Sequence, residues 1–342
     1  MIIRAKSYPR AGLIGNPSDG YNGKTIAFVF RNFSAEVVLY ETPELEILPN
    51  TRDHSKFESI GALSADVGQF GYYGGIRLLK ATVKRFHDYC RENGIDLHDA
   101  NFTIRYSTDI PSQVGLAGSS AIITACMRAL MGFYQVTIPK PVLANLILSV
   151  ETRELGIPAG LQDRVAQVYE GLVYMDFDKG LMGKQGWGQY EALDPGLLPP
   201  LYLAYRAEFA EGTEVLHSDL RERFNRGDAE VLEAIREWAD LAVQVRDLLK
   251  RGEGRSMGPI LDRNFDIRRG VCRVSEGNIR MVAAARSAGA SAKFTGSGGA
   301  IVGTYEDEAM YRVLEERLSA IGVRVLKPQI AAVPEARKGG GS

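Results

Sequence analysis

A glycine- and serine-rich segment at residues 110–121 has the composition of a loop that holds phosphate groups. Gly115 and Gly118 let the backbone approach a ligand closely, and Ser119 and Ser120 offer hydroxyl groups where an apolar helix is expected to begin. The first N–H groups of a helix attract an anion without help from a lysine. The same residues would also make an ordinary helix N-cap after a turn, so the local sequence leaves both interpretations open.

Two more familiar nucleotide motifs are incomplete. Residues 20–25 end like a Walker A loop, but Ser18 stands where its first glycine belongs, and a strand is expected to follow instead of a helix. Residues 296–299 begin like a dinucleotide fingerprint, but Ile301 stands where the third glycine belongs. A tight turn between strands explains this second glycine cluster equally well.

Two carboxylates follow the loop at positions that suit phosphoryl transfer. Glu151 lies on a helix expected at 141–152, and Asp163 lies in a loop that runs into a short helix. A carboxylate can bind Mg²⁺ or accept the proton of an acceptor hydroxyl. A solvated helix-end charge and a helix N-cap explain the two residues equally well, and Glu154 is an alternative metal ligand one turn further on.

The elements that must position these groups follow from the spacing of apolar residues. In the first half, strands are expected at 13–14, 25–30, 35–40, 44–48, 101–107 and 172–177, and helices at 75–93, from 119 and at 141–152. In the second half, strands are expected at 201–205, 291–295, 300–303 and 323–326, and helices at 229–251 and 306–321. A stretch at 180–200, dense in glycine and proline, indicates a domain boundary.

Composition excludes several classes of protein. The 342 residues suit two domains, and the net charge of −1 offers no field that would attract nucleic acid or an anionic membrane. Three cysteines and four histidines lack the spacing of a disulfide framework or a zinc site. The N-terminus shows no signal peptide and no membrane span, which favours a cytoplasmic enzyme, while the oligomeric state stays open.

Three separated segments resemble the three motifs of the GHMP kinases, the family of galactokinase, homoserine kinase and mevalonate kinase. They lie at 10–19, 111–121 and 293–300, in the family's order. Within the family, residues 15–21 and 262–269 resemble the glucuronokinase subgroup. One departure is Gly-Leu-Ala-Gly-Ser-Ser in the second motif, where many members have Gly-Leu-Gly-Ser-Ser. Alanine is small enough to keep the backbone cradle.

The resemblance implies an α+β fold with two domains and an active site between them. Residues 1–195 would form a ribosomal-protein-S5-domain-2-like domain with a left-handed βαβ crossover, 196–336 a ferredoxin-like domain, and 337–342 a flexible tail. The implied reaction is ATP-dependent phosphorylation of D-glucuronate at its anomeric hydroxyl, with Mg²⁺. The alternatives are a GHMP kinase for a neutral sugar or an isoprenoid-pathway acid, and a catalytically inactive regulatory protein.

The resemblance also assigns roles to residues. Nucleotide binding falls to Pro111, Gly115, Leu116, Ala117, Gly118, Ser119, Ser120 and Ala121, and metal binding to Ser120 and Glu151. Asp163 would be the base, kept ionised by Arg164 beside it, and Arg10 the cation that stabilises the transferred charge. Acceptor binding falls to Asn16, Asp19, Tyr21, Arg268, Gly296 and Gly298, although the first three also suit a plain turn.

The acceptor's carboxylate calls for arginine, because a guanidinium group offers a planar, bidentate fork. The candidates are Arg206, Arg263, Arg268 and Arg269. Among them we favour Arg268, which lies in the segment at 262–269.

Overall fold

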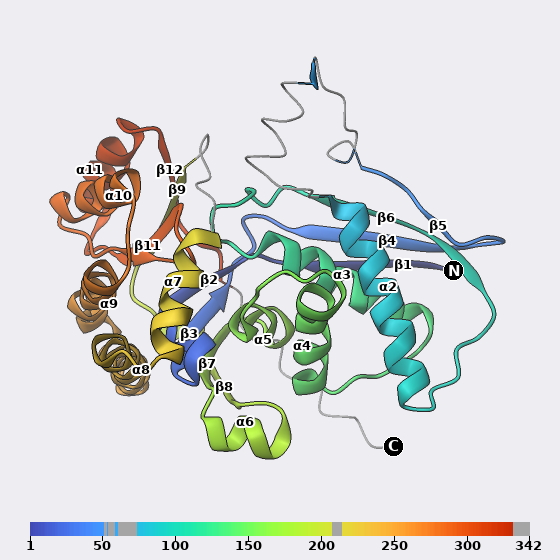
Figure 1. The fold of residues 1–342 in the computed structure, drawn as a ribbon. Coiled ribbons are helices and arrows are strands. Elements are labelled where there is room, and N and C mark those ends of the chain that lie inside the picture. Colours follow the sequence, from blue (N-terminus) through green and yellow to red (C-terminus); the bar gives the residue numbers. More distant parts are fainter. Residues whose placement is uncertain (51–52, 54–58, 61–73, 207–213, 331–342) are drawn as a thin grey trace, which may run out of the picture.

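The structure is a computed structural model that describes residues 1–50, 53, 59–60, 74–206 and 214–330. In these parts of the chain the strands form three four-stranded sheets, and helices pack against them (Figure 1). The predicted α+β class is therefore confirmed. The tail predicted at 337–342 and the end of the predicted C-terminal domain lie outside the described residues.

The first sheet lies where the chain begins (Figure 1). Its strand order is β1 (Ile2–Ser7), β4 (Ala35–Thr42), β6 (Asn101–Thr108) and β5 (Glu46–Ile47). Helix α3 (Gly118–Phe133) contacts β1, β4 and β6, and helix α2 (Gly75–Glu92) packs on α3. Strand β5 pairs in parallel with β6, and α2 lies between them in the sequence, which makes a βαβ unit. The left-handedness of this crossover stays a prediction.

The second sheet is antiparallel and carries the first motif. Its order is β2 (Arg10–Ile14), β3 (Lys24–Val29), β7 (Leu172–Asp176) and β8 (Gln189–Leu193). Strand β3 is buried from Thr25 onward because helices α5 (Leu161–Tyr169) and α8 (Ala229–Lys250) both contact it. A strand covered in this way has a nearly continuous apolar sequence, as this one does.

The third sheet belongs to the C-terminal half. Its strands follow one another in the chain as β9 (Leu201–Arg206), β10 (Lys293–Phe294), β11 (Ala300–Thr304) and β12 (Val323–Leu326), and they lie in the order β10-β11-β9-β12. The helices of this half are α7 (Glu214–Asn225), α8, α9 (Gly258–Val271), α10 (Glu276–Ser287) and α11 (Glu308–Ser319), of which α9 and α11 contact the third sheet and α8 contacts the second. Two βαβ-like halves that interleave in this order are the ferredoxin-like arrangement.

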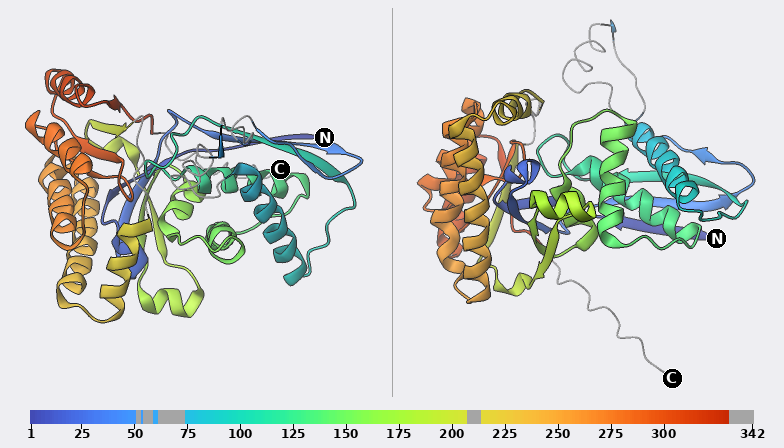
Figure 2. Two further views of the ribbon diagram at one scale, coloured as in Figure 1. Left: turned by 45° about the horizontal axis from the view of Figure 1, so that its top comes forward. Right: turned by 60° about the horizontal axis from the view of Figure 1, so that its bottom comes forward.

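The C-terminal helices gather at one end of the molecule, shown in orange and red in both views of Figure 2, and the first sheet with its helices lies at the other. Strand β2 contacts α8, α9 and β11. The two halves of the chain therefore meet along the strand that begins with Arg10, and also along β3, which contacts α8.

The stretch at 180–200, which is predicted to mark a domain boundary, contains regular elements. It contains helix α6 (Lys179–Gln185), strand β8 and a 3-10 turn at Pro195–Leu197. Gly186 ends α6 with φ at +83°, a left-handed conformation that glycine adopts without strain. Gly180 and Gly183 lie inside α6, so glycine does not prevent a short helix here, and β8 joins the second sheet by pairing with β7.

Three further helices were not expected from the sequence, namely α7 (Glu214–Asn225), α9 and α10. Helix α9 contains a dense run of charged residues at 262–269, which hides its apolar spacing, yet Leu261, Phe265 and Ile267 are buried. The expected helix at 141–152 is α4 (Lys140–Ser149), which continues into a π-helical turn at Val150–Glu154.

The cysteines are free thiols, as expected. Among the residues that the structure describes, no helix combines the length and the apolar character needed to cross a bilayer.

Candidate active site

The predicted phosphate loop connects β6 to α3. Gly115 and Ala117 have φ angles of +71° and +61°, a left-handed conformation that costs an alanine free energy but not a glycine. Ala117 occupies the N-cap position of α3, and no side chain of the described residues caps the helix there. The first N–H groups of α3 are therefore oriented for an anion. Leu116 and Ala121 are buried in the core, which restricts any ligand contact to their backbone.

The two loop serines point to different partners. The Ser119 hydroxyl donates to Oε1 of Glu151 at 3.0 Å. The Ser120 hydroxyl, which is buried, donates to the Ala117 carbonyl at 3.1 Å. The structure therefore brings Glu151 together with Ser119, whereas the sequence paired it with Ser120.

Glu151 lies on the π-helical turn after α4, and only 3% of its side chain is exposed. Such turns often occur at functional sites. The carboxylate and the Ser119 hydroxyl form the kind of sparse oxygen set that Mg²⁺ accepts when phosphates and waters complete its shell. These two residues fit a Mg²⁺ ion bound mainly through a nucleotide, and the described residues contain no larger cluster of metal-binding side chains. The alternative ligand, Glu154, instead pairs with Lys84 at 3.0 Å.

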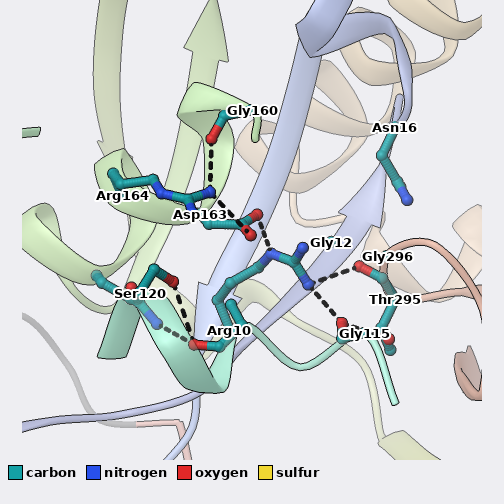
Figure 3. A network of polar contacts seen from close by, with 12 residues as sticks. Arg10, Gly12, Asn16, Gly115, Ser120, Gly160, Asp163, Arg164, Thr295 and Gly296 are labelled. Atoms are coloured by element: carbon teal, nitrogen blue, oxygen red, sulfur yellow. Dashed lines mark hydrogen bonds and ion pairs between the residues drawn. The ribbon is translucent and has the colours of Figure 1, made fainter. Parts of the chain in front are cut away.

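Asp163 lies in the first turn of α5, between two arginines (Figure 3). Arg10 Nε donates to its Oδ1 at 2.6 Å, and Arg164 Nη1 lies 3.3 Å from its Oδ2. The N-cap of α5 is Gly160, and the Asp163 carboxylate caps nothing in the described chain. The interpretation of Asp163 as a helix cap is therefore wrong.

Arg10 joins all three motifs. Its Nη1 donates to the carbonyl oxygens of Gly115 at 2.7 Å and Thr295 at 3.1 Å (Figure 3). The side chain is 7% exposed. Its guanidinium group thus links the first motif to the phosphate loop, to the third motif and to Asp163.

The third motif packs against the loop through a glycine. A Cβ atom at Gly296 would lie 2.6 Å from the Gly115 carbonyl oxygen and 3.1 Å from Nη2 of Arg10. Gly298, with φ at +147°, lies beside Asn278. Gly296 thus permits close contact between two motifs, a role the acceptor-binding prediction did not include.

The predicted acceptor residues sit on the turn after β2. Asn16 is buried, and its Oδ1 accepts a hydrogen bond from the Lys293 ammonium group. Asp19 Oδ2 would lie 2.8 Å from a Cβ atom at Gly160, which places this carboxylate at the start of α5. Burial and the Asp163 carboxylate raise the pKa of Asp19 to about 7.

Helix α7 covers this turn from outside. Tyr21 is buried against Phe224, with ring centroids 4.9 Å apart. The Arg221 guanidinium group lies 4.2 Å from the centroid of the Tyr21 ring and donates to the Gly20 carbonyl at 2.8 Å. Arg221 was missed from the sequence because no motif contains it.

The four arginines predicted as candidates for the acceptor's carboxylate differ in their burial and in their partners. Arg263 is exposed and pairs with Glu237 at 2.5 Å, and Arg269 is exposed. Arg206 lies beside Gly277 on α10. Only Arg268 is buried at the motifs, where it donates to the carbonyl oxygens of Gly296 at 2.7 Å and Ser297 at 3.0 Å.

Lys293 is a second buried cation near Arg268. Its Nζ donates to the Gly12 carbonyl at 2.8 Å as well as to Asn16. Burial lowers the pKa of Lys293 well below its usual range and also lowers the pKa of Arg268. Within the described ranges, neither side chain has a carboxylate within 4.0 Å. Lys293 was missed as a site residue although it begins the third motif.

Comparison with known proteins gives two kinds of similarity. The family model for the N-terminal domain of GHMP kinases matches residues 77–171. The chain is 46% identical to "Probable glucuronokinase 2" of Arabidopsis thaliana over 94% of this chain and 89% of that protein. It is 44% identical to "Glucuronokinase 1" of the same plant over 96% and 92%.

A solved structure shares the fold. The Lactococcus lactis galactokinase complexed with galactose superposes with a TM-score of 0.74 at 14% identity, covering 97% of this chain and 94% of the galactokinase.

Proposed function

The chain belongs to the GHMP kinase family, with glucuronokinases among its relatives, and we propose that it transfers the γ-phosphoryl group of ATP to the anomeric hydroxyl of D-glucuronate. The products are D-glucuronate 1-phosphate and ADP. The observation that carries the choice of an acidic sugar is the pair of buried basic side chains, Lys293 and Arg268, which have no carboxylate within 4.0 Å in the described chain and whose charged forms burial disfavours until an anion binds beside them.

A buried charge without a counter-charge is costly, and the cost falls when an anionic ligand binds. The acceptor's carboxylate has the charge and size to fill that role. Asp19 lies on the neighbouring turn and would supply a polar group for sugar hydroxyls, whereas the Asn16 amide bonds to Lys293 and to the Phe294 carbonyl. A neutral sugar would leave the cations uncompensated, so the site should discriminate against it.

The nucleotide end uses the start of α3. Its free N–H groups suit the ATP phosphates, and Ser119 and Glu151 would hold Mg²⁺, which when bound neutralises charge on those phosphates. Ser120, the metal ligand predicted from the sequence, is an alternative to Ser119. Its hydroxyl would first have to give up its hydrogen bond to the Ala117 carbonyl.

At the point of transfer, Asp163 accepts the proton of the acceptor hydroxyl and Arg10 stabilises the moving charge. The support is their 2.6 Å ion pair beside the loop and the third motif. Arg10 also orients the carboxylate, since it fixes Oδ1 of Asp163 from a rigid, buried position.

The proposed domain boundary is at 195/196. It is supported by the pairing of β8 with β7 and of β9 with β11 and β12. The active site would lie between the two domains, where β2 contacts α9 and β11. The proposed location of the enzyme is the cytoplasm.

An ADP-release assay over D-glucuronate, D-galacturonate, D-glucose, D-galactose, mevalonate and homoserine tests the proposal. We expect D-glucuronate to give the highest kcat/KM, and phosphorus NMR to show an anomeric phosphate in the product. Faster turnover of galactose, mevalonate or homoserine would refute the substrate assignment. Nucleotide binding without turnover of any acceptor would favour the alternative of an inactive regulatory protein.

A further inference from the structure

Arg164 connects the two carboxylates that carry different tasks in the proposed reaction. Its side chain is 4% exposed. Nη1 donates to the Gly160 carbonyl at 2.8 Å and lies 3.3 Å from Oδ2 of Asp163, while Nη2 donates to Oε2 of Glu151. One guanidinium group therefore bridges the base and the carboxylate next to Ser119.

The two carboxylates depend on Arg164 to different degrees. Asp163 has a second cation, Arg10, at 2.6 Å. Glu151 pairs with Arg164 and with no other cation among the described residues. Because the Glu151 carboxylate is buried, its charge without a ligand is balanced by Arg164.

We propose that Arg164 is a positioning residue that couples the metal-nucleotide site to the base. It neutralises Glu151 before the nucleotide binds and releases Oε2 when a divalent cation arrives, while Nη1 keeps its contacts with Gly160 and Asp163. This inference rests on the proposed function, because it takes Glu151 as a metal ligand and Asp163 as the base.

The geometry explains why arginine suits this task. The guanidinium plane is rigid, so the contact of Nη1 with the Gly160 carbonyl holds Nη2 toward Glu151. A divalent cation at Glu151 competes with Nη2 for the same oxygen and repels the guanidinium charge. Arg164 therefore opposes metal binding at Glu151 and supports the orientation of Asp163.

This role predicts opposite effects on two measurements. In Arg164→Gln, Glu151 no longer has to give up an ion pair when a metal binds. Mn²⁺ together with a non-hydrolysable ATP analogue should therefore bind at least about fivefold more tightly. This factor is the lower end of the coupling usually found between two sites. Turnover with saturating Mg²⁺ and ATP should fall about tenfold or more, because Asp163 loses one of its two cations. A merely structural arginine would weaken both.

The experiment titrates Mn²⁺ by electron paramagnetic resonance in the presence of the ATP analogue. Arg128→Gln is the matched control, since Arg128 also joins a carboxylate, Glu170 at 2.8 Å, to backbone carbonyls. It lies outside the proposed site and should leave the Mn²⁺ affinity unchanged. Arg164→Lys, with a single ammonium group, reaches one carboxylate at a time and should restore only one of the two properties.

The outcomes separate this inference from the proposed function. If the wild-type protein binds Mn²⁺ no better with the ATP analogue than without it, the proposed kinase site fails and the inference fails with it. If the wild type binds and Arg164→Gln binds equally or more weakly, only the coupling role is overturned. Should Arg164→Gln not fold, the same Mn²⁺ titration and the turnover assay are carried out on Arg164→Lys. If this variant matches the wild type in both Mn²⁺ affinity and turnover, the coupling role of Arg164 is overturned.

Discussion

Asp163 is held in place by charge as well as by its helix. Arg10 and Arg164 bind different oxygens of the carboxylate, so its orientation is set from two sides. Asp19 lies at the same end of α5, and the negative charge of Asp163 contributes to the raised pKa of Asp19. Two carboxylates in different surroundings can then perform different roles at one pH.

The first prediction concerns the base. Asp163→Asn keeps the size of the side chain but cannot accept a proton, so kcat should fall on the order of 100-fold while nucleotide affinity persists. Steady-state kinetics and calorimetric titration with an ATP analogue measure the two effects. A loss of only a few-fold in kcat would assign Asp163 an orienting role.

The second prediction concerns the acceptor's carboxylate. Arg268→Met should raise the KM for D-glucuronate on the order of tenfold or more, and should change the KM for a neutral sugar much less. Arg268 also binds the loop at Gly296 and Ser297, so the ratio of the two KM values is the informative quantity. The control is Arg263→Met, because Arg263 is exposed and pairs with Glu237. Equal losses for both sugars would remove Arg268 from the carboxylate site.

The third prediction concerns pH. The pKa of Asp19 is raised from 3.8 to about 7 in the folded protein, so the folded state binds a proton that the unfolded state releases. The contribution of Asp19 to the free energy of unfolding should therefore fall as pH rises from about 4 to about 7, and the loss persists above that range. Asp19→Asn removes this penalty, so its stability relative to the wild type should be greater at pH 8 than at pH 5. Urea unfolding at both pH values checks this, and a difference of the opposite sign would contradict it.

At the level of elements, the start of α3 decides which hydroxyl meets Glu151. Successive residues of a helix point about 100° apart, and in this structure Ser119 and Ser120 face different partners. Ser119 lies on the side of the π-helical turn that carries Glu151, and Ser120 turns back to Ala117.

The fourth prediction follows from that direction. Ser119→Ala should raise the Mg²⁺ concentration needed for half-maximal activity on the order of 10-fold, because a ligand or its close hydrogen-bond partner is lost. Ser120→Ala should have a smaller effect, since its hydroxyl satisfies its own helix start. Mg²⁺ titrations of both variants measure this difference. If Ser120→Ala raises the required Mg²⁺ concentration more than Ser119→Ala does, the prediction that Ser120 and Glu151 together bind the metal is supported. The loop would then have to rearrange when the nucleotide binds.

At the level of the whole molecule, the site exists because three distant segments meet. Residues 12 and 295 are joined by a backbone hydrogen bond of 2.8 Å, and Arg10 binds both Gly115 and Thr295. Strand β2 contacts α5 from the N-terminal half and α8, α9 and β11 from the C-terminal half, and β3 likewise contacts both α5 and α8. A change that separates the motifs should therefore reduce stability and activity together.

The fifth prediction tests that contact. Gly296→Ala places a methyl group 2.6 Å from the Gly115 carbonyl oxygen, so the motifs must move apart, at a cost of about 1–3 kcal/mol in the free energy of unfolding. The matched control is Gly183→Ala in α6, where a Cβ atom meets nothing within 4 Å in the described structure. Urea unfolding should show a loss for the first variant and no loss for the second. Equal stability of the two variants would contradict the close contact.

The sequence alone determined the family, the α+β class and the positions of most strands, because periodicity and motif order are local properties of the chain. The segment containing Ser119 and Ser120 was identified as a helix start from its glycines and hydroxyls. Helix α9 was missed, because its buried residues are interrupted by charges that find partners only in the folded protein, such as Asp262 with Arg286 at 2.9 Å.

Only the tertiary structure decided which of these residues act together. It paired Glu151 with Ser119 and Arg164, and it ruled out a capping role for Asp163. It also brought Lys293 to Gly12, across 281 positions of the chain. The physical reason is that hydrogen bonds and ion pairs depend on distance and direction in space. Local spacing fixes the direction of a side chain on its own helix or strand, and the packing of the helices and sheets decides what it meets.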